Sequence, residues 1–438
     1  MRMRLFLLLL SGLLSQFSAQ NIILKNVNII PVNHEITIPG CNVFIRDGKI
    51  EKITPFPYVK EPGRRAKKKE PTAGYTMIDC EGGFLMPGMA DMHAHFPEKE
   101  DALKLQDFLK LELASGVTFV RSMRGEKKQL AVRDSVSKGL KKNAPELIVS
   151  FVLNQSDSII GRDSLQKLIS YAKNSGFDFI KYLGGMKEKT FIDLSELCKM
   201  NRFPIAGHAY DNSLQRTMDA GFYSVEHYQP VLKASKLNPD HFRKQLDTLK
   251  TKRIGICPTL SFYKIYGFPF KEEELLNRNG MNYVSSKVKK EWQKQYNEDL
   301  NAAKENFKTD FESKYQIPSK KNLESFYPVL KSCADAGVLL LLSPDECAFN
   351  VPGFAMYEEM MLYKEAGLTN YQILRSATLN AAKCLQDNSW GSVEIGKKAN
   401  LVLLEANPLE DLSNIKKVKA VILHGRYMLQ SDLVKPTK

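Results

Sequence analysis

The chain has 438 residues, of which 43% are hydrophobic and 26% charged, and its formal net charge is +14. This length and composition exclude a disordered or fibrous protein and predict one large globular domain with a smaller accessory domain. The seven cysteines are scattered, odd in number and contain no Cys-x-x-Cys pair. Their spacing therefore argues against a disulfide framework or a structural zinc knuckle.

Residues 1–20 have the layout of a secretory signal peptide. A basic start containing Arg2 and Arg4 precedes an apolar run at 5–14, and mostly small and polar residues follow as far as Gln20. The run is too short to span a bilayer as a helix. We predict that it is removed and that the mature protein is secreted or periplasmic, with no stable membrane insertion. An N-terminal membrane anchor is the alternative.

Both ends of the mature chain are predicted to be β-rich. Residues 21–86 and 391–438 contain short apolar runs separated by turns, and Asp47-Gly48 is a hairpin signal between two such runs. We expect the two segments to pair into one small β-sandwich. The predicted runs are 22–30, 43–46, 50–53 and 77–79, then 391–393, 401–404 and 420–423.

Residues 87–390 repeat one pattern: a helical face, a glycine and an apolar β-run. A glycine in this place fits a left-handed helix cap, and the repetition predicts parallel β/α units. Eight runs favour an α/β fold with a (β/α)8 TIM-like barrel, although periodicity alone also permits an open doubly wound sheet. The predicted strands are 85–91, 117–120, 147–153, 179–182, 204–208, 223–226, 254–259 and 338–342.

Two charged segments lie outside this repeat. Residues 271–321 are predicted to be a helical insertion at the mouth of the barrel, either a lid or a solvated decoration. The basic cluster at 64–69 is able to attract an anionic partner, but Glu61 and Glu70 flank it and no aromatic residue is interleaved. We interpret the cluster as a solvated loop and expect no nucleic-acid partner.

Histidines gather at the ends of the predicted strands. His93 and His95 alternate by two, so their side chains project from one face of a strand and form a chelating pair. Two further histidines end the fifth and sixth strands, an aspartate follows the eighth, and a lone lysine lies inside the apolar fourth strand. Barrel enzymes place catalytic groups at these strand ends. The candidate set is His93, His95, Lys181, His208, His227 and Asp345.

The sequence around this pair resembles a known family. Residues 82–95, Gly-Gly-Phe-Leu-Met-Pro-Gly-Met-Ala-Asp-Met-His-Ala-His, are similar to the opening signature of the amidohydrolase superfamily. The closest branch is the imidazolonepropionase-like and Xaa-Pro dipeptidase-like group. The resemblance covers nearly the whole mature chain and continues through 116–118, 179–181, 207–210, 224–227, 257–260, 377–382 and 396–402.

The resemblance implies a role for each candidate residue. His93, His95 and Asp345 would hold one divalent metal ion, and His208 and His227 a second, with zinc as the expected element. Lys181 would bridge the two ions as a carboxylated lysine. Asp345 would also act as the catalytic acid and base, and a metal-activated hydroxide would attack the substrate. Tyr210 is expected to contact a small-molecule substrate or, alternatively, to pack at the barrel rim.

The substrate is less sharply implied than the metal site. The branch suggests a small amide, such as a dipeptide or an N-acyl amino acid. Two loops depart from the family pattern, however, because Arg124-Gly125 follows the second strand and residues 154–161 form a short loop without histidine. A cyclic amide or lactone as substrate is therefore one alternative, and a non-catalytic metal-binding pocket is another. A homo-oligomer is also compatible with the sequence.

Overall fold

The computed structural model describes residues 21–56, 72–97, 103–153, 161–268 and 270–437. The predicted signal peptide, the basic cluster at 64–69 and nearly all of the 154–161 loop lie outside these residues. Within them, no helix is both long enough and apolar enough to cross a membrane. All seven cysteines are unpaired and buried.

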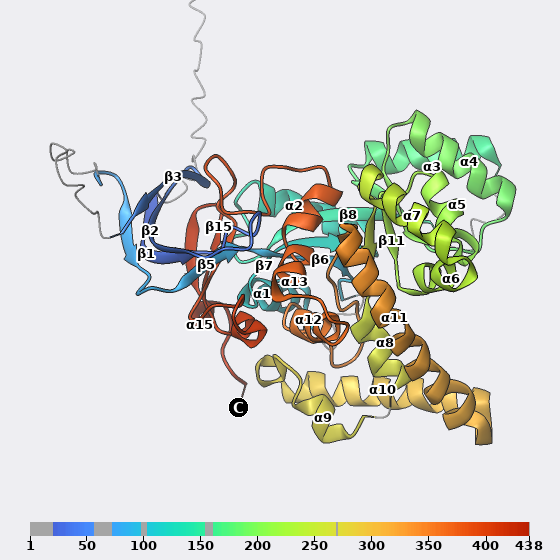
Figure 1. The fold of residues 1–438 in the computed structure, drawn as a ribbon. Coiled ribbons are helices and arrows are strands. Elements are labelled where there is room, and N and C mark those ends of the chain that lie inside the picture. The colour runs from blue at the N-terminus through green and yellow to red at the C-terminus, as the bar shows by residue number, and fades with distance from the viewer. Residues whose placement is uncertain (1–20, 57–71, 98–102, 154–160, 269, 438) are drawn as a thin grey trace, which may run out of the picture.

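A curled sheet of eight parallel strands forms the middle of the molecule (Figure 1). Its spatial order, β13 to β6, follows the sequence without reversal, unlike the order of a doubly wound sheet. A hydrogen bond from Met92 N to Leu342 O (3.1 Å) joins β6 to the segment that follows β13. The strands are β6 (Met89–Ala94), β7 (Val117–Ser122), β8 (Glu146–Leu153), β9 (Phe179–Tyr182), β10 (Ile205–His208), β11 (Ser224–Glu226), β12 (Gly255–Cys257) and β13 (Leu339–Leu340).

Each predicted strand of the repeat overlaps an observed strand, but the first prediction was wrong in extent. The run at 85–91 divides at Gly88 into β5 (Phe84–Pro87), which joins the other sheet, and β6. A Cβ atom at Gly88 would lie 2.2 Å from Thr118 Oγ1, so only glycine lets the backbone pass here. The change of sheet therefore occurs at a position that tolerates no side chain.

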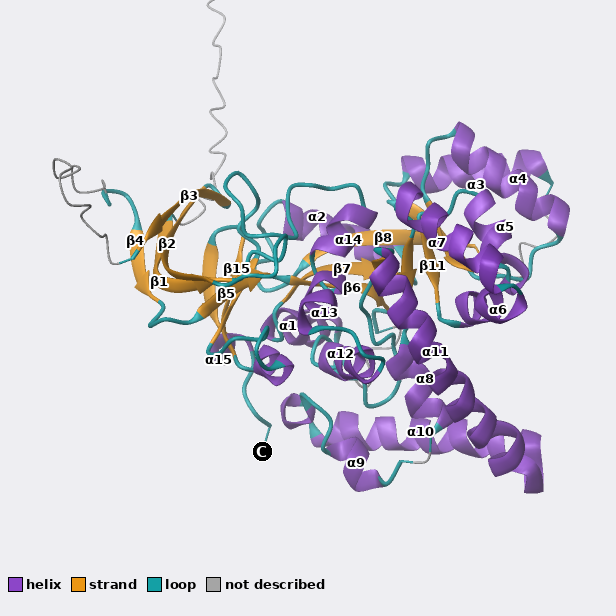
Figure 2. Ribbon diagram, in the orientation of Figure 1, coloured by secondary structure: helices purple, strands orange, loops and turns teal. Residues whose placement is uncertain are grey.

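A second, mixed sheet is built from both ends of the chain, as predicted (Figure 2). Its order is β16-β15-β14-β5-β1-β2-β3, with β4 also paired to β1. The hairpin at Asp47-Gly48 is confirmed, whereas residues 391–393 form no strand. The strands are β1 (Ile22–Ile29), β2 (Ile38–Arg46), β3 (Lys49–Pro55), β4 (Thr76–Asp79), β14 (Leu401–Leu404), β15 (Val418–Leu423) and β16 (Arg426–Leu429).

Helices follow the strands of the curled sheet and cover it, and a last short helix follows β16 of the mixed sheet. The glycines predicted as helix caps, at 116, 176, 221 and 337, all have positive φ. The helices are α1 (Leu105–Ala114), α2 (Lys127–Ser137), α3 (Arg162–Asn174), α4 (Glu188–Met200), α5 (Leu214–Asp219), α6 (Gln229–Leu237), α7 (Pro239–Lys252), α8 (Leu260–Gly267), α11 (Ile317–Ala336), α12 (Met356–Glu365), α13 (Asn370–Ser376), α14 (Leu379–Cys384) and α15 (Gln430–Leu433).

The predicted insertion is helical. It contains α9 (Glu272–Leu276) and the long helix α10 (Ser286–Phe307), and it runs into α11. Both α9 and α10 lie at one side of the molecule in Figure 1. The chain end also reaches the insertion, because Thr437 N donates to Asn282 O (2.8 Å).

Candidate metal centre

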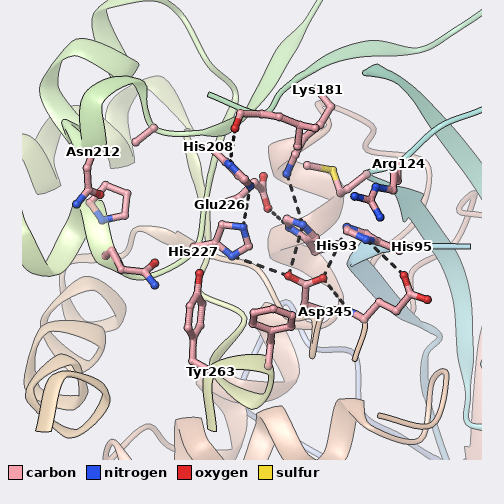
Figure 3. A pocket seen from close by; sticks show the side chains of 17 residues that line it. His93, His95, Arg124, Lys181, His208, Asn212, Glu226, His227, Tyr263 and Asp345 are labelled. Carbon is pink, nitrogen blue, oxygen red and sulfur yellow. Dashed lines mark hydrogen bonds and ion pairs between the residues drawn. The ribbon is translucent and has the colours of Figure 1, made fainter. Parts of the chain in front are cut away.

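A cavity of about 610 Å3 opens at the carboxyl ends of the curled-sheet strands. Figure 3 shows that side chains from separate strands and loops converge on it. All six candidate metal ligands line this cavity: His93, His95, Lys181, His208, His227 and Asp345. The structure therefore brings the predicted set together, although the role of each residue stays a prediction.

His93, His95 and Asp345 form the first group. Asp345 Oδ1 lies 3.6 Å from His95 Nε2, and Asp345 Oδ2 lies 3.7 Å from His93 Nε2. One donor atom from each residue lies within 4.8 Å of the others. Burial lowers the pKa of His93 well below its usual value, with Lys181 adding to the effect, so this imidazole is neutral at pH 7.

His208 and His227 form the second group, and their Nε2 atoms lie 3.1 Å apart. His208 Nδ1 lies 2.8 Å from Leu183 O, and because a carbonyl only accepts, Nδ1 carries the hydrogen and leaves a lone pair on Nε2. His227 Nδ1 lies 2.8 Å from Thr259 Oγ1. With that hydroxyl as acceptor, both histidines present Nε2 lone pairs to the same point.

Lys181 lies between the two groups. It is 1% exposed, and its Nζ is 3.5 Å from His93 Nε2. Burial lowers the pKa of Lys181 to about 8, although Glu226 and Asp345 oppose the shift. A larger share of neutral amine is therefore present near pH 7 than for an exposed lysine, and neutral amine is the form that reacts with carbon dioxide.

Backbone strain is concentrated at the same strand ends. His227, Thr259 and Asp345 have φ values of 70°, 54° and 60°, in the left-handed region that non-glycine residues seldom adopt. Each such residue costs about 1–3 kcal/mol, which the surrounding packing must offset. Strain of this kind is typical of sites where the direction of a side chain matters more than local stability.

The donor set fits divalent metal ions. His95 Nε2 is buried and has no hydrogen-bond partner among the described residues. Two nitrogens bound to one tetrahedral zinc ion lie roughly 3.3 Å apart, which is close to the spacings within both groups. Another triple, His93, Glu226 and Cys257, is also compact, but burial raises the pKa of the Cys257 thiol well above its usual value and Glu226 is already paired.

Sequence reasoning missed a buried support behind the centre. Glu226, on β11, faces His93 Nδ1 at 2.7 Å and accepts two hydrogen bonds from Arg121 Nη2, at 2.9 and 3.1 Å. Both Glu226 and Arg121 are almost fully buried. An acceptor at Nδ1 fixes the hydrogen there and directs the Nε2 lone pair of His93 into the cavity. The available signal was an ionisable residue inside each of two apolar strands.

Tyr210 does not line the cavity. Its ring stacks on Phe191 at 4.0 Å between centroids and belongs to a buried cluster, and a contact with substrate stays a prediction. Positive φ values at Asp211 and Asn212 turn the chain, so that Asn212 lines the cavity instead. The tyrosine that does face the site is Tyr263, whose ring lies 5.7 Å from that of His227 (Figure 3).

Replacing Gly207 by alanine is expected to destabilise β10 by about 2–4 kcal/mol and to displace His208. Gly207 has φ +138°, and a Cβ there would lie 2.1 Å from the carbonyl oxygen of Tyr182. Chemical denaturation measures the loss. Gly161→Ala, where a Cβ meets nothing within 4 Å, is the control and should shift stability by only a few tenths of a kcal/mol. Equal shifts in both variants would refute the steric argument.

The three buried histidines of the site are expected to remove stability from the metal-free protein as the pH drops below 6.5, while buried carboxyl groups with raised pKa values, Asp91, Glu112 and Glu359, act in the opposite direction. Burial lowers the pKa of His208 to about 4 and the pKa values of His93 and His227 well below 6.5. The unfolded chain therefore binds more protons below pH 6.5, and each histidine removes about 1.4 kcal/mol of stability per pH unit. Unfolding of chelator-treated protein from pH 7 to pH 4.5 tests this.

Two variants isolate the histidine contribution to this pH dependence. His208→Gln should lower the slope of unfolding free energy against pH by about 1.4 kcal/mol per pH unit within this window, because it removes one histidine contribution. His241→Gln, which alters an exposed histidine on α7, should leave the slope unchanged. A His208 variant with the parental slope would mean that the acid loss of stability comes from other groups.

Comparison with known proteins identifies relatives at the level of the family and the fold. The model of the amidohydrolase family matches residues 84–428. No curated protein matches the sequence. Among solved structures, a proposed prolidase from Bifidobacterium longum has a TM-score of 0.70 and 19% identity, with 94% of this chain and 95% of that chain covered.

Two further structures are similar over nearly the same length. A Xaa-Pro dipeptidase with methionine bound in its active site has a TM-score of 0.68 and 17% identity, covering 94% of this chain and 100% of that chain. A bottromycin amidohydrolase has a TM-score of 0.68 and 20% identity, covering 94% and 88%. At these identities the likeness shows a shared fold.

Proposed function

The chain belongs to the amidohydrolase family, and from this premise we propose that it is a metal-dependent hydrolase that cleaves the C–N bond of a small amide. A dipeptide or an N-acyl amino acid is the substrate class that fits the dipeptidases among its structural neighbours. In this proposal the curled sheet is a (β/α)8 barrel and the mixed sheet is its β-sandwich partner. The supporting observation is the convergence of all six candidate ligands on one cavity.

Each residue has a defined task in this proposal. His93, His95 and Asp345 would hold one ion, His208 and His227 the other, and Lys181, in a carboxylated form, would be a further ligand. When bound, divalent ions, with zinc as the expected element, would supply Lewis acidity towards water and the amide carbonyl. Glu226, hydrogen-bonded to Nδ1 of His93, fixes the orientation of that ring. Asp345 takes a proton from the attacking water and returns it to the leaving nitrogen.

A metal analysis and a substrate panel test the proposal. We expect about two divalent ions per chain, and we expect a set of dipeptides and N-acyl amino acids to be hydrolysed in a chelator-sensitive manner. Lactams and lactones of similar size form the second arm of the panel. If only these compounds are hydrolysed, the substrate class is a cyclic amide or lactone and not an open-chain amide. A metal-free, chelator-insensitive protein that turns over neither arm would contradict the proposal.

Secretion is part of the same proposal and has its own test. The layout of residues 1–20 supports an export signal. We expect the mature protein, recovered outside the cytoplasm, to begin near residue 20 or 21 when its N-terminus is sequenced. An intact N-terminus on a cytoplasmic protein would contradict export without bearing on the chemistry.

A further inference from the structure

A second cavity, of about 670 Å3, adjoins the candidate metal centre. Four residues line both cavities: His95, Arg124, Asp345 and Glu346. The far wall of this second cavity comes from helix α10 of the insertion, through Glu291, Trp292 and Gln295. The insertion therefore contributes one wall of a chamber whose opposite wall is the metal site, and we call this cavity the α10 chamber.

Carboxyl groups outnumber basic side chains in the walls of the α10 chamber. Among the described residues that line it, Asp91, Glu112, Glu291, Asp345 and Glu346 are acidic, while Arg124, at the border with the metal centre, is the single lysine or arginine. Carboxylates gathered around a partly enclosed volume favour a positively charged ligand, because the low dielectric of the walls strengthens the attraction. The charge pattern therefore points to a cation at the α10 end.

Glu112 supplies an independent indication of a ligand. It is 1% exposed, comes from α1 and lines the chamber, and its Oε2 has no hydrogen-bond partner among the described residues. Burial raises the pKa of Glu112 well above its usual value, Asp91 adds to this, and the amide of Gly353 opposes it. An unpaired buried carboxyl oxygen costs about 1–3 kcal/mol, a cost that a hydrogen-bond donor in the chamber would remove.

Two aromatic side chains complete the chamber. Trp292, from α10, and Tyr266, from α8, both line it. An ammonium group is attracted to the face of an aromatic ring, most strongly to tryptophan, and it also donates to carboxylates. A protonated amine therefore matches the carboxyl groups and the aromatic groups of the same walls, whereas an anion or a plain alkyl group matches only part of them.

We propose that the α10 chamber is a subsite for a protonated amine on the substrate, so that the preferred amide carries an ammonium group at a distance from the bond that is cleaved. The assignment to substrate rests on the proposed hydrolytic function, whereas amine binding does not. Since His95 and Asp345 border both cavities, one molecule is able to place its amide at the centre and its ammonium in the chamber.

Tryptophan fluorescence tests amine binding without any turnover. The chain has two tryptophans, Trp292 in the chamber wall and Trp390, which is buried and stacks on Phe119. We expect n-hexylamine to change the emission saturably at constant ionic strength, while n-hexanoate and 1-hexanol bind at least ten-fold more weakly. The response should vanish in Trp292→Phe and persist in Trp390→Phe.

Charge variants locate the amine. Glu112→Gln keeps the size of the buried side chain but removes its carboxyl group, and Glu291→Gln changes an exposed residue of α10, so the two variants test opposite walls of the chamber. Each should weaken hexylamine binding several-fold. Glu298→Gln, on the same helix but outside the chamber lining, should not. No saturable change, equal binding of hexanoate, or a response that survives Trp292→Phe would overturn the subsite.

Matched substrates connect the subsite to catalysis. Among hydrolysed amides, an amine-bearing compound should have at least ten-fold higher kcat/KM than its neutral isostere, and Glu291→Gln should reduce that ratio. Amine binding without any hydrolysis would reject the proposed function but would retain the α10 chamber as an amine-binding site. Hydrolysis with equal kcat/KM for the amine-bearing and neutral compounds would reject the chamber as a substrate subsite but would retain the proposed function.

Discussion

Replacing Asp345 by asparagine is expected to lower kcat/KM for amide hydrolysis by about 10²–10⁴-fold without unfolding the protein. Asn keeps the shape of the side chain but neither takes up a proton nor carries the charge that faces two histidines, at 3.6 Å (His95) and 3.7 Å (His93). Burial raises the pKa of Asp345, which makes the ionised carboxylate a stronger base than an exposed aspartate. The loss should therefore appear mainly in kcat.

The measurement needs activity, metal content and stability on the same preparation. Asp240→Asn, an exposed carboxylate of α7, is the matched control and should behave as the parent protein. If Asp345→Asn also releases one ion per chain, the residue serves as a ligand as well as a base. Parental activity in the Asp345 variant would remove it from the chemistry, whatever its metal content.

The second large effect is on stability. Arg121→Met is expected to lower the free energy of unfolding by about 3–5 kcal/mol, because it leaves the carboxylate of Glu226 buried without its partner. Arg121 also donates to Met92 O (2.5 Å) and Ser224 Oγ (2.6 Å), so these acceptors lose a donor as well. Chemical denaturation at neutral pH measures the change.

A double variant separates charge from packing. Arg121→Met combined with Glu226→Leu removes both charges, and stability should recover by several kcal/mol relative to the single variant. Metal affinity should instead fall by about 10–100-fold in the double variant, because His93 has then lost Glu226 as its acceptor. If the double variant is as unstable as Arg121→Met alone, the loss comes from the shape of arginine and not from the unpaired carboxylate.

Local patterns predicted the strands and the placement of the candidate ligands. His93 and His95 show the two-residue period of a strand, and Lys181 is the lone charged residue in an apolar run. The local sequence pattern alone was therefore enough to identify these residues as candidates. The pairing of Arg121 with Glu226 was out of reach because it depends on which strands face each other across 105 residues. The α10 chamber could not be predicted either, because nothing in the sequence of the insertion shows which part of the fold it packs against.

Two departures from the expected arrangement have identifiable physical causes. The run at 85–91 is continuous in hydrophobicity, and the close approach of Thr118 to the Gly88 backbone, where a Cβ would clash, marks the point at which it divides between two sheets. Tyr210 directly follows the His208-Ala209 pair, so we expected it to contact the substrate. The structure packs its ring on Phe191 in the core, and the left-handed turn at Asp211 and Asn212 places Asn212 in the cavity lining.

The join between the first and last parallel strands sets the order in which the protein acquires its centre. The hydrogen bond from Ser343 Oγ to Asp91 Oδ1 spans 252 residues, and Asp345 reaches His93 and His95 only when this join has formed. Contacts of such sequence separation form late in folding, because their loop-closure entropy is repaid only after the intervening units are in place. During refolding, full metal affinity should therefore appear after most of the helical structure has formed. The rate of metal uptake then reports the rate of the last folding step.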